Sequence, residues 1–120
     1  MSEQSAGLEN LSAEDAKLVT LARATRARAR ASEGAAVRDL DGRTYAAASV
    51  RLEHLSLSAL EVCVAMALSS GSTGLEAAVV LTEGGAPDLA AAGDFTGAGV
   101  PVMVGGPDGA LHSRLATPGP

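Results

Sequence analysis

Few side chains in this chain of 120 residues stand in a local pattern that could carry acid–base or nucleophilic chemistry. Ser58 precedes Glu61 by three residues, directly before an apolar stretch. A serine hydroxyl could act as a nucleophile, but the sequence indicates no base beside it. The same S-x-x-E spacing is the capping box of a helix, in which the hydroxyl and the carboxylate each accept a backbone N–H. Capping is therefore the favoured role of both residues.

Three residues of the types that bind transition metals are also present, namely Cys63, His54 and His112. Cys63 lies inside the apolar stretch, so a role as a small core residue is favoured over metal ligation. The two histidines flank polar strand ends and are predicted to be surface groups. Acidic residues are ordinary on a protein surface, although three of them form a conceivable set of oxygen ligands. These are Glu53, Glu61 and Asp88.

A basic face is predicted on the first helix, which begins after the capping residue Ser12 and extends to about Ser32. Arg23, Arg26 and Arg30 share this face. Two interpretations stay open. The arginines contact an anion or RNA, or they form a solvated face whose positive charge is favourable near the helix C-terminus. Because no aromatic residue accompanies them to stack on bases, the solvated face is favoured.

The apolar stretch after Ser58 predicts the element around which the chain is organised. Residues 58–70 are predicted to form one helix, which Gly71 ends in a left-handed conformation. Nearly every position within it is apolar, which is typical of a helix buried on all sides. The stretch is too short to cross a bilayer, which needs about 20 apolar residues. We therefore expect a central helix that the rest of a small domain surrounds.

Strand signals lie on both sides of this helix. Two strands at 35–40 and 43–50 are predicted, joined by a two-residue Asp41-Gly42 turn. Residues 75–82 contain the continuous apolar run of a strand buried on both faces. The order predicts an α/β three-layer fold with a mixed sheet of about five strands covered by helices. The remaining expected elements are a short helix at 88–92, capped by Asp88, and strands at 100–104 and 110–115.

Length and composition limit the function. The chain is predicted to form a single domain at 12–115, between a flexible N-terminal tail at 1–11 and a C-terminal tail at 116–120. Aromatic residues make up 2%, so the core consists of small side chains, and self-association is a favourable way to bury more surface. The net charge of −5 argues against a protein dominated by binding to nucleic acid or a membrane surface. A polar N-terminus and a single cysteine favour a cytoplasmic protein.

Several segments resemble the small zinc-dependent cytidine deaminases. The segment GAAVRDLDGRTYAAASV, residues 34–50, is similar to the family's V-G-A-A…D-G-x-x-Y-x-G-x-N-V segment, and EAAVVL is similar to the strand after its central helix. Pro87 stands where the family's P-C-x-x-C helix begins, and VPVMVGGPDGAL resembles its penultimate strand and D-G turn. The similarity covers about residues 11–115. It implies the cytidine deaminase-like three-layer fold, with residues 58–70 as the central helix.

The sequence differs from this family at the motifs that carry out the family's reaction. Zinc deamination needs three N or S ligands, an open fourth position for water, and a Glu that transfers protons. The family supplies them from C-A-E or H-A-E on the central helix and from P-C-x-x-C on the next helix. In the second motif, Asp88 and Ala91 replace the cysteines. Three registers of the first motif stay open, and none supplies the ligand, although the last keeps the acid: Ser58-Ala59-Leu60, Leu60-Glu61-Val62 and Ala59-Leu60-Glu61.

The family's ribose-binding N-x-E pair is incomplete as well, since it falls on Ser49 and Arg51 or on Arg51 and Glu53. The resemblance therefore predicts a catalytically inactive relative without zinc or another cofactor, acting as a homo-oligomeric binding or scaffold module, a dimer or a tetramer. Two alternatives stay open, a nucleoside deaminase with an unrecognised zinc site and a nucleoside-binding sensor. Short relatives are often encoded near a ribosome-assembly GTPase, which implies an RNA-related protein partner at the arginine face.

Overall fold

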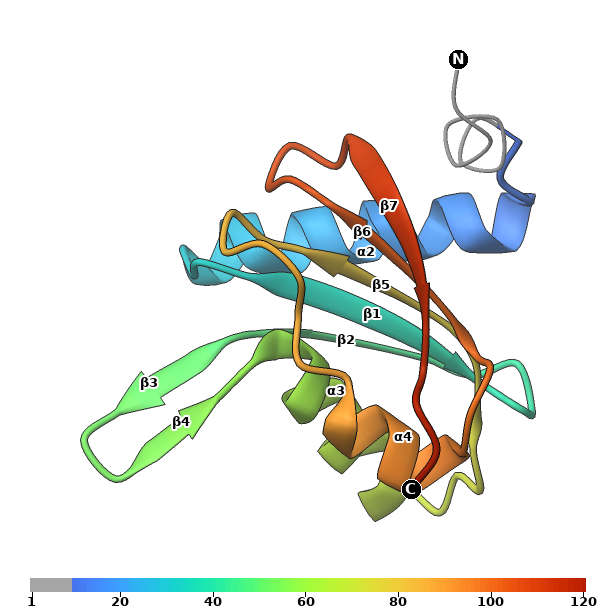
Figure 1. Ribbon diagram of the computed structural model, residues 1–120. Coiled ribbons are helices and arrows are strands. Elements are labelled where there is room, and N and C mark those ends of the chain that lie inside the picture. The colour runs from blue at the N-terminus through green and yellow to red at the C-terminus, as the bar shows by residue number, and fades with distance from the viewer. Residues whose placement is uncertain (1–9) are drawn as a thin grey trace.

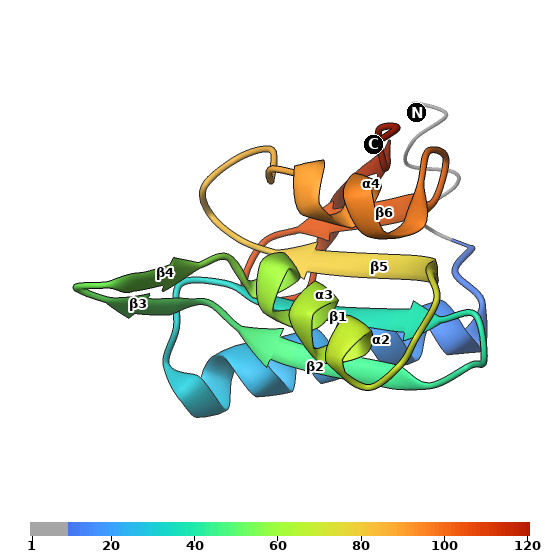
Figure 2. The same ribbon diagram turned by 90° about the horizontal axis from the view of Figure 1, so that it is seen from below.

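The computed structural model of this protein describes residues 10–120. Figures 1 and 2 show three layers, with α2 on one face of the main sheet and with α3 and α4 on the other. The predicted three-layer α/β fold is confirmed. The elements in chain order are α2 (Ala13–Ala29), β1 (Gly34–Asp39), β2 (Thr44–Ala48), β3 (Val50–Leu52), β4 (Leu55–Leu57), α3 (Ala59–Ser69), β5 (Leu75–Leu81), α4 (Ala90–Thr96), β6 (Pro101–Gly105) and β7 (Leu111–Ala116).

The main sheet is mixed, as predicted, and has five strands in the order β2-β1-β5-β6-β7. Only β5 and β6 are parallel, and α4 lies in the crossover between them. The strand at 75–82 is buried on both faces. Val79 belongs to the cluster under α2, while Val80 belongs to the cluster under α3 and α4. This alternation follows from the two-residue period of a strand.

The first helix is shorter than predicted. Ser12 caps it, because its hydroxyl accepts the N–H of Asp15 at 3.1 Å. The helix ends at Ala29 and does not continue to Ser32, because Arg30 adopts a left-handed conformation with φ +54°. Its N–H then bonds to the free carbonyls of the last turn, which ends the helix.

The predicted β1–β2 hairpin is present, but its turn is wider than two residues. The N–H of Gly42 bonds to the Asp39 carbonyl at 3.0 Å, and Asp39 N–H bonds to the Arg43 carbonyl at 2.8 Å. Only Gly42, with φ +84°, has a positive φ in this turn. The reason is the buried Asp39 carboxylate, which accepts the N–H groups of Asp41 at 3.0 Å and Arg43 at 2.9 Å. These bonds fix a three-residue loop with glycine at its end.

The central helix begins and ends as predicted, between the capping residue Ser58 and the left-handed Gly71. The prediction that it is buried on all sides is wrong. Met66 is 38% exposed and Leu68 is 60% exposed, since the sheet and α4 cover only one side of α3. Within residues 10–120, a single copy of the chain leaves the outer apolar face of this helix open.

A small hairpin between β2 and α3 was not predicted. β3 and β4 form a separate two-stranded sheet, which we call the arm. The strand predicted at 43–50 is thus divided at Ser49 into β2 and the start of the arm. Figures 1 and 2 show the arm projecting from the body of the domain, beside the start of α3.

Smaller differences occur after β5. α4 begins two residues later than the helix predicted at 88–92, and Asp88 is not its N-cap, although its Oδ1 accepts the N–H of Ala90 at 2.9 Å. The last two strands lie one residue further along than predicted. In the predicted C-terminal tail, Thr117 is buried and donates to the Gly97 carbonyl at 2.6 Å. The predicted N-terminal tail at 1–11 falls mostly outside the described residues. No helix within residues 10–120 has the length and the apolar run that crossing a membrane requires.

Candidate functional site

A cavity of about 490 Å³ lies at the N-terminal end of α3. Its wall combines the connection between α2 and β1, the base of the arm and the first turn of α3. The volume lies within the range of about 300–1,000 Å³ that is usual for small-molecule sites. Polar and charged side chains dominate the lining: Ser32, Glu33, Ser49, Arg51, Ser56, Ser58 and Glu61.

Glu33 connects three elements at this cavity. One carboxylate oxygen accepts the N–H of Ala59, in the first turn of α3, at 3.3 Å. The other accepts the hydroxyl of Thr82, just after β5, at 3.1 Å. The buried Thr82 hydroxyl in turn accepts the N–H of Gly84 at 2.9 Å. The sequence analysis missed Glu33, because its partners lie 26 and 49 residues away and no local pattern marks it.

The predicted capping box is formed. The Ser58 hydroxyl accepts the N–H of Glu61 at 3.1 Å, and the Glu61 carboxylate accepts the N–H of Ser58 at 2.8 Å. With Glu33, two carboxylates therefore occupy the positive end of α3 and use its first N–H groups. Anions bind at a helix N-terminus through those N–H groups and the helix dipole. A further anion is disfavoured here, because the two carboxylates already bond to these N–H groups and already interact with the helix dipole.

The serines at the other side of the cavity are also engaged. Ser49 Oγ accepts the N–H of Glu33 at 3.2 Å and lies 3.3 Å from Ser32 Oγ. Arg51, at the base of the arm, is exposed and lines the cavity. The lining is thus built mainly from side chains that hold the α2–β1 connection, β2 and α3 together.

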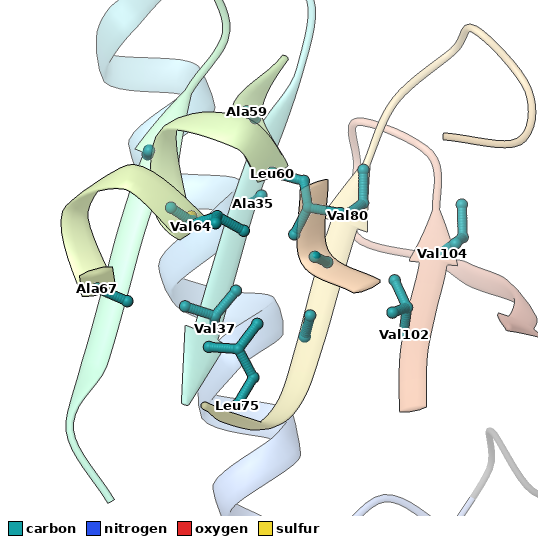
Figure 3. Close-up of a cluster of buried hydrophobic side chains, with 14 residues drawn as sticks. Ala35, Val37, Ala59, Leu60, Val64, Ala67, Leu75, Val80, Val102 and Val104 are labelled. Carbon is teal, nitrogen blue, oxygen red and sulfur yellow. The ribbon is translucent and has the colours of Figure 1, made fainter. Parts of the chain in front are cut away.

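Leu60 lies behind this cavity in the apolar core. It is 2% exposed and belongs to the buried cluster between the sheet, α3 and α4. Figure 3 shows its side chain extending from α3 toward Val80 of β5. Ala91, in the first turn of α4, is half-buried, and the exposed Asp88 is bonded to the backbone of Ala90. At the starts of the two helices, Leu60 is therefore a core side chain, Ala91 carries only a methyl group, and Asp88 faces solvent.

Of the three candidate N and S ligands of a metal ion, one is buried and two are exposed on different elements. Cys63 is buried, its Sγ lies 3.6 Å from the Tyr45 carbonyl, and burial raises the pKa of its thiol to about 12. His54, in the turn of the arm, and His112, on β7, are both exposed. Among residues 10–120, no three His, Cys, Asp or Glu side chains gather closely enough to hold a metal ion.

The structure does not keep the three arginines of α2 in equivalent positions. Arg26 is half-buried and donates to the Ala31 carbonyl at 3.2 Å, so it stabilises the end of its own helix. Arg30 leaves the helical conformation, while Arg23 stays exposed on the helix surface. A contact between these arginines and RNA or another anion stays a prediction.

A comparison with protein families decides the relationship. The family model described as Cytidine deaminase-like matches residues 11–109, which is most of the chain. This protein belongs to the cytidine deaminase-like family. A comparison with the curated proteins finds no match.

The resemblance to the zinc-dependent members implies a zinc ion between the starts of α3 and α4, and the residues present there do not fit one. In the register Leu60-Glu61-Val62, the ligand position is a buried hydrocarbon side chain. In the register that begins at Ser58, the hydroxyl already accepts a backbone N–H. The second motif offers only Ala91 and an exposed carboxylate in place of two thiolates. Zinc in proteins is held by thiolate, imidazole or carboxylate groups that converge on it, and no such set converges here.

Proposed function

We propose that this chain is a catalytically inactive member of the cytidine deaminase-like family that acts as a homo-oligomeric binding or scaffold module. The observation that carries the proposal is the first turn of α3. There Leu60 is buried in the core, while Glu61 and Glu33 are both bonded to backbone N–H groups of that turn. The two carboxylates at this turn that could move a proton of water are therefore engaged in hydrogen bonds.

The alternative of a deaminase with another metal site is less well supported. Hydrolytic deamination needs an activated water and an acid–base residue that reaches the reacting base. Both oxygens of Glu33 already accept hydrogen bonds, at 3.3 and 3.1 Å, and the Glu61 carboxylate closes the capping box at 2.8 Å. Releasing either carboxylate exposes the N–H groups at the end of α3, which costs about 0.5–2 kcal/mol of helix capping.

Elemental analysis of protein purified without chelators tests this proposal, together with an assay of cytidine turnover. We expect no stoichiometric zinc and no release of ammonia. A zinc-dependent cytidine deaminase purified and assayed in the same way is the positive control for both measurements. Stoichiometric zinc in the natural chain, or measurable deamination, contradicts the proposal.

A second candidate function, a nucleoside-binding sensor without catalysis, is favoured by the 490 Å³ cavity. The exposed Arg51 and Ser56, which line it, offer hydrogen bonds to a polar, uncharged ligand. Thermal-shift measurements with nucleosides test it, because a ligand at 100 times its dissociation constant adds about 2.7 kcal/mol of stability. Nucleotides serve as the comparison, and the carboxylates at α3 disfavour their phosphates. The absence of a shift with every nucleoside contradicts the sensor role.

The proposed binding role has two parts, contact between copies of this chain and contact with a protein partner. The exposed apolar side chains of α3, such as Met66 and Leu68, favour a contact between copies over a free surface. Light scattering on the full chain gives the oligomeric state, which we expect to be a dimer or a tetramer. An RNA-related protein partner, contacted through the arginines of α2, is the second part of the binding role.

A further inference from the structure

The arm is an amphipathic hairpin. Its strand pairs are Val50 with Leu57, Arg51 with Ser56, and Leu52 with Leu55. Paired residues point to the same face of a hairpin, and residues two apart on one strand do so too. The arm therefore has one face that is entirely apolar and an opposite face that is polar. The apolar face consists of Val50, Leu52, Leu55 and Leu57, and the polar face of Arg51 and Ser56.

The apolar face of the arm is open to water toward its tip. Leu52 is 66% exposed and Leu55 is 45% exposed. A two-stranded hairpin of this kind is marginally stable in water, and packing against another surface is what normally stabilises it. Figures 1 and 2 show the arm extending away from the sheet and from α2. The rest of residues 10–120 thus leaves a large part of both leucines exposed.

An apolar groove of about 540 Å³ lies beside the base of the arm. The outer face of α3 provides Val62, Ala65 and Met66, and β2 provides Tyr45. Leu57 lines this groove and also belongs to the apolar face of the arm. The arm and the groove are therefore parts of one continuous surface, which combines an apolar projection with an apolar hollow. Among residues 10–120, no Asp, Glu, Lys or Arg lines the groove.

We propose, on the basis of the homo-oligomeric role above, that two copies pair about a two-fold axis near Leu57, each laying its arm across the α3 groove of the other. A two-fold contact uses the same surface on both copies, so a projection and a hollow on one surface complement each other twice. The chain carries a net charge of −5, so two copies repel one another overall. The groove has no charged lining among residues 10–120, which lets two copies approach there without opposing like charges.

Charge substitutions on the two faces of the arm test this pairing. Leu52→Asp with Leu55→Asp places carboxylates on the apolar face, and we expect it to raise the dissociation constant of the pair at least about 30-fold. Leu55→Asp alone is compared with Ser56→Asp, which adds the same single carboxylate on the opposite face of the arm and which we expect to leave association unchanged. Light scattering over a range of concentrations measures the change, and circular dichroism verifies that each variant is folded.

Crosslinking tests the geometry independently of stability. A chain with Leu55→Cys mixed with a chain carrying Met66→Cys should form a mixed disulfide dimer under oxidation, because each arm lies over the groove of the other copy. Cys63 does not interfere, since it is buried with a raised pKa. If the chain is oligomeric but the leucine variant associates normally and no mixed disulfide forms, the arm exchange is wrong and the homo-oligomer stands. If the natural chain is monomeric at every concentration, both are wrong.

Discussion

The buried carboxylate of Asp39 offers a test of how this small domain is stabilised. Asp39 is 1% exposed and accepts hydrogen bonds from the N–H groups of Asp41 and Arg43 and from the hydroxyl of Ser72. Ser72 lies 3.3 Å from the hydroxyl of Tyr45. These hydrogen bonds join the β1–β2 turn to the segment that connects α3 to β5.

The expected loss in Asp39→Ala follows from these three bonds. A hydrogen bond to a charged group contributes about 1.5–3 kcal/mol, but the exposed backbone at Asp41 and Arg43 can bond to water instead. We therefore expect the free energy of unfolding to fall by about 2–4 kcal/mol, most of it from the buried Ser72 hydroxyl and the lost turn geometry. At roughly 4 °C per kcal/mol, the melting temperature falls by about 8–16 °C. Asp39→Asn keeps the shape and should cost less.

The pH dependence has a defined sign. The hydrogen bond from Ser72 lowers the pKa of Asp39 below its ordinary value of 3.8, and the N–H groups of Arg43 and Asp41 act in the same direction, against the opposing effect of burial. A lowered pKa in the folded state means that the stabilisation is complete above about pH 3.8 and is lost as the pH falls through the folded value. Ser72→Ala should therefore reduce the loss of stability in acid.

Urea unfolding at neutral pH and at a series of acidic pH values measures both effects. Asp108→Ala is the control, because Asp108 also accepts a turn N–H, at 3.0 Å, but is exposed. We expect it to change stability by no more than about 0.5 kcal/mol. Equal losses in Asp39→Ala and Asp108→Ala, or an acid dependence that Ser72→Ala leaves unchanged, would refute the assignment of this network.

Two further predictions concern the end of α3 and the arginines of α2. Glu33→Ala leaves the N–H of Ala59 and the hydroxyl of Thr82 without their acceptor, and it should cost about 1–3 kcal/mol in urea unfolding; an unchanged midpoint contradicts the role of Glu33 as a second cap. If α2 contacts RNA, binding in a filter or fluorescence assay should weaken steeply with salt, and replacement of the arginines by Ala should reduce that salt dependence. Unchanged binding by the triple variant, in which Arg23, Arg26 and Arg30 are replaced, excludes this face as the contact.

Local signals in the sequence predicted the elements because their causes lie within a few residues. Ser58 and Glu61 are three apart, so the capping box that starts α3 depends on little else. The apolar run of β5 requires cover on both faces, and the structure provides it. The arm also had a signal, since apolar residues alternate around the turn at Glu53 and His54, but its lack of Gly or Asn hid the hairpin.

The tertiary structure decided which apolar faces are covered and which distant polar groups meet. Composition could not show that α3 is covered on one side only, because burial depends on the neighbours that the fold supplies. The pairings of Glu33 with Thr82 and of Asp39 with Ser72 join residues 49 and 33 positions apart, so no spacing rule could find them. The sequence by itself predicted the order of the elements apart from the arm, because the signals for the other elements are local. Only the folded chain brings α3 and α4 into contact, buries Leu60 between them and the sheet, and places the carboxylates of Glu33 and Glu61 on the first N–H groups of α3.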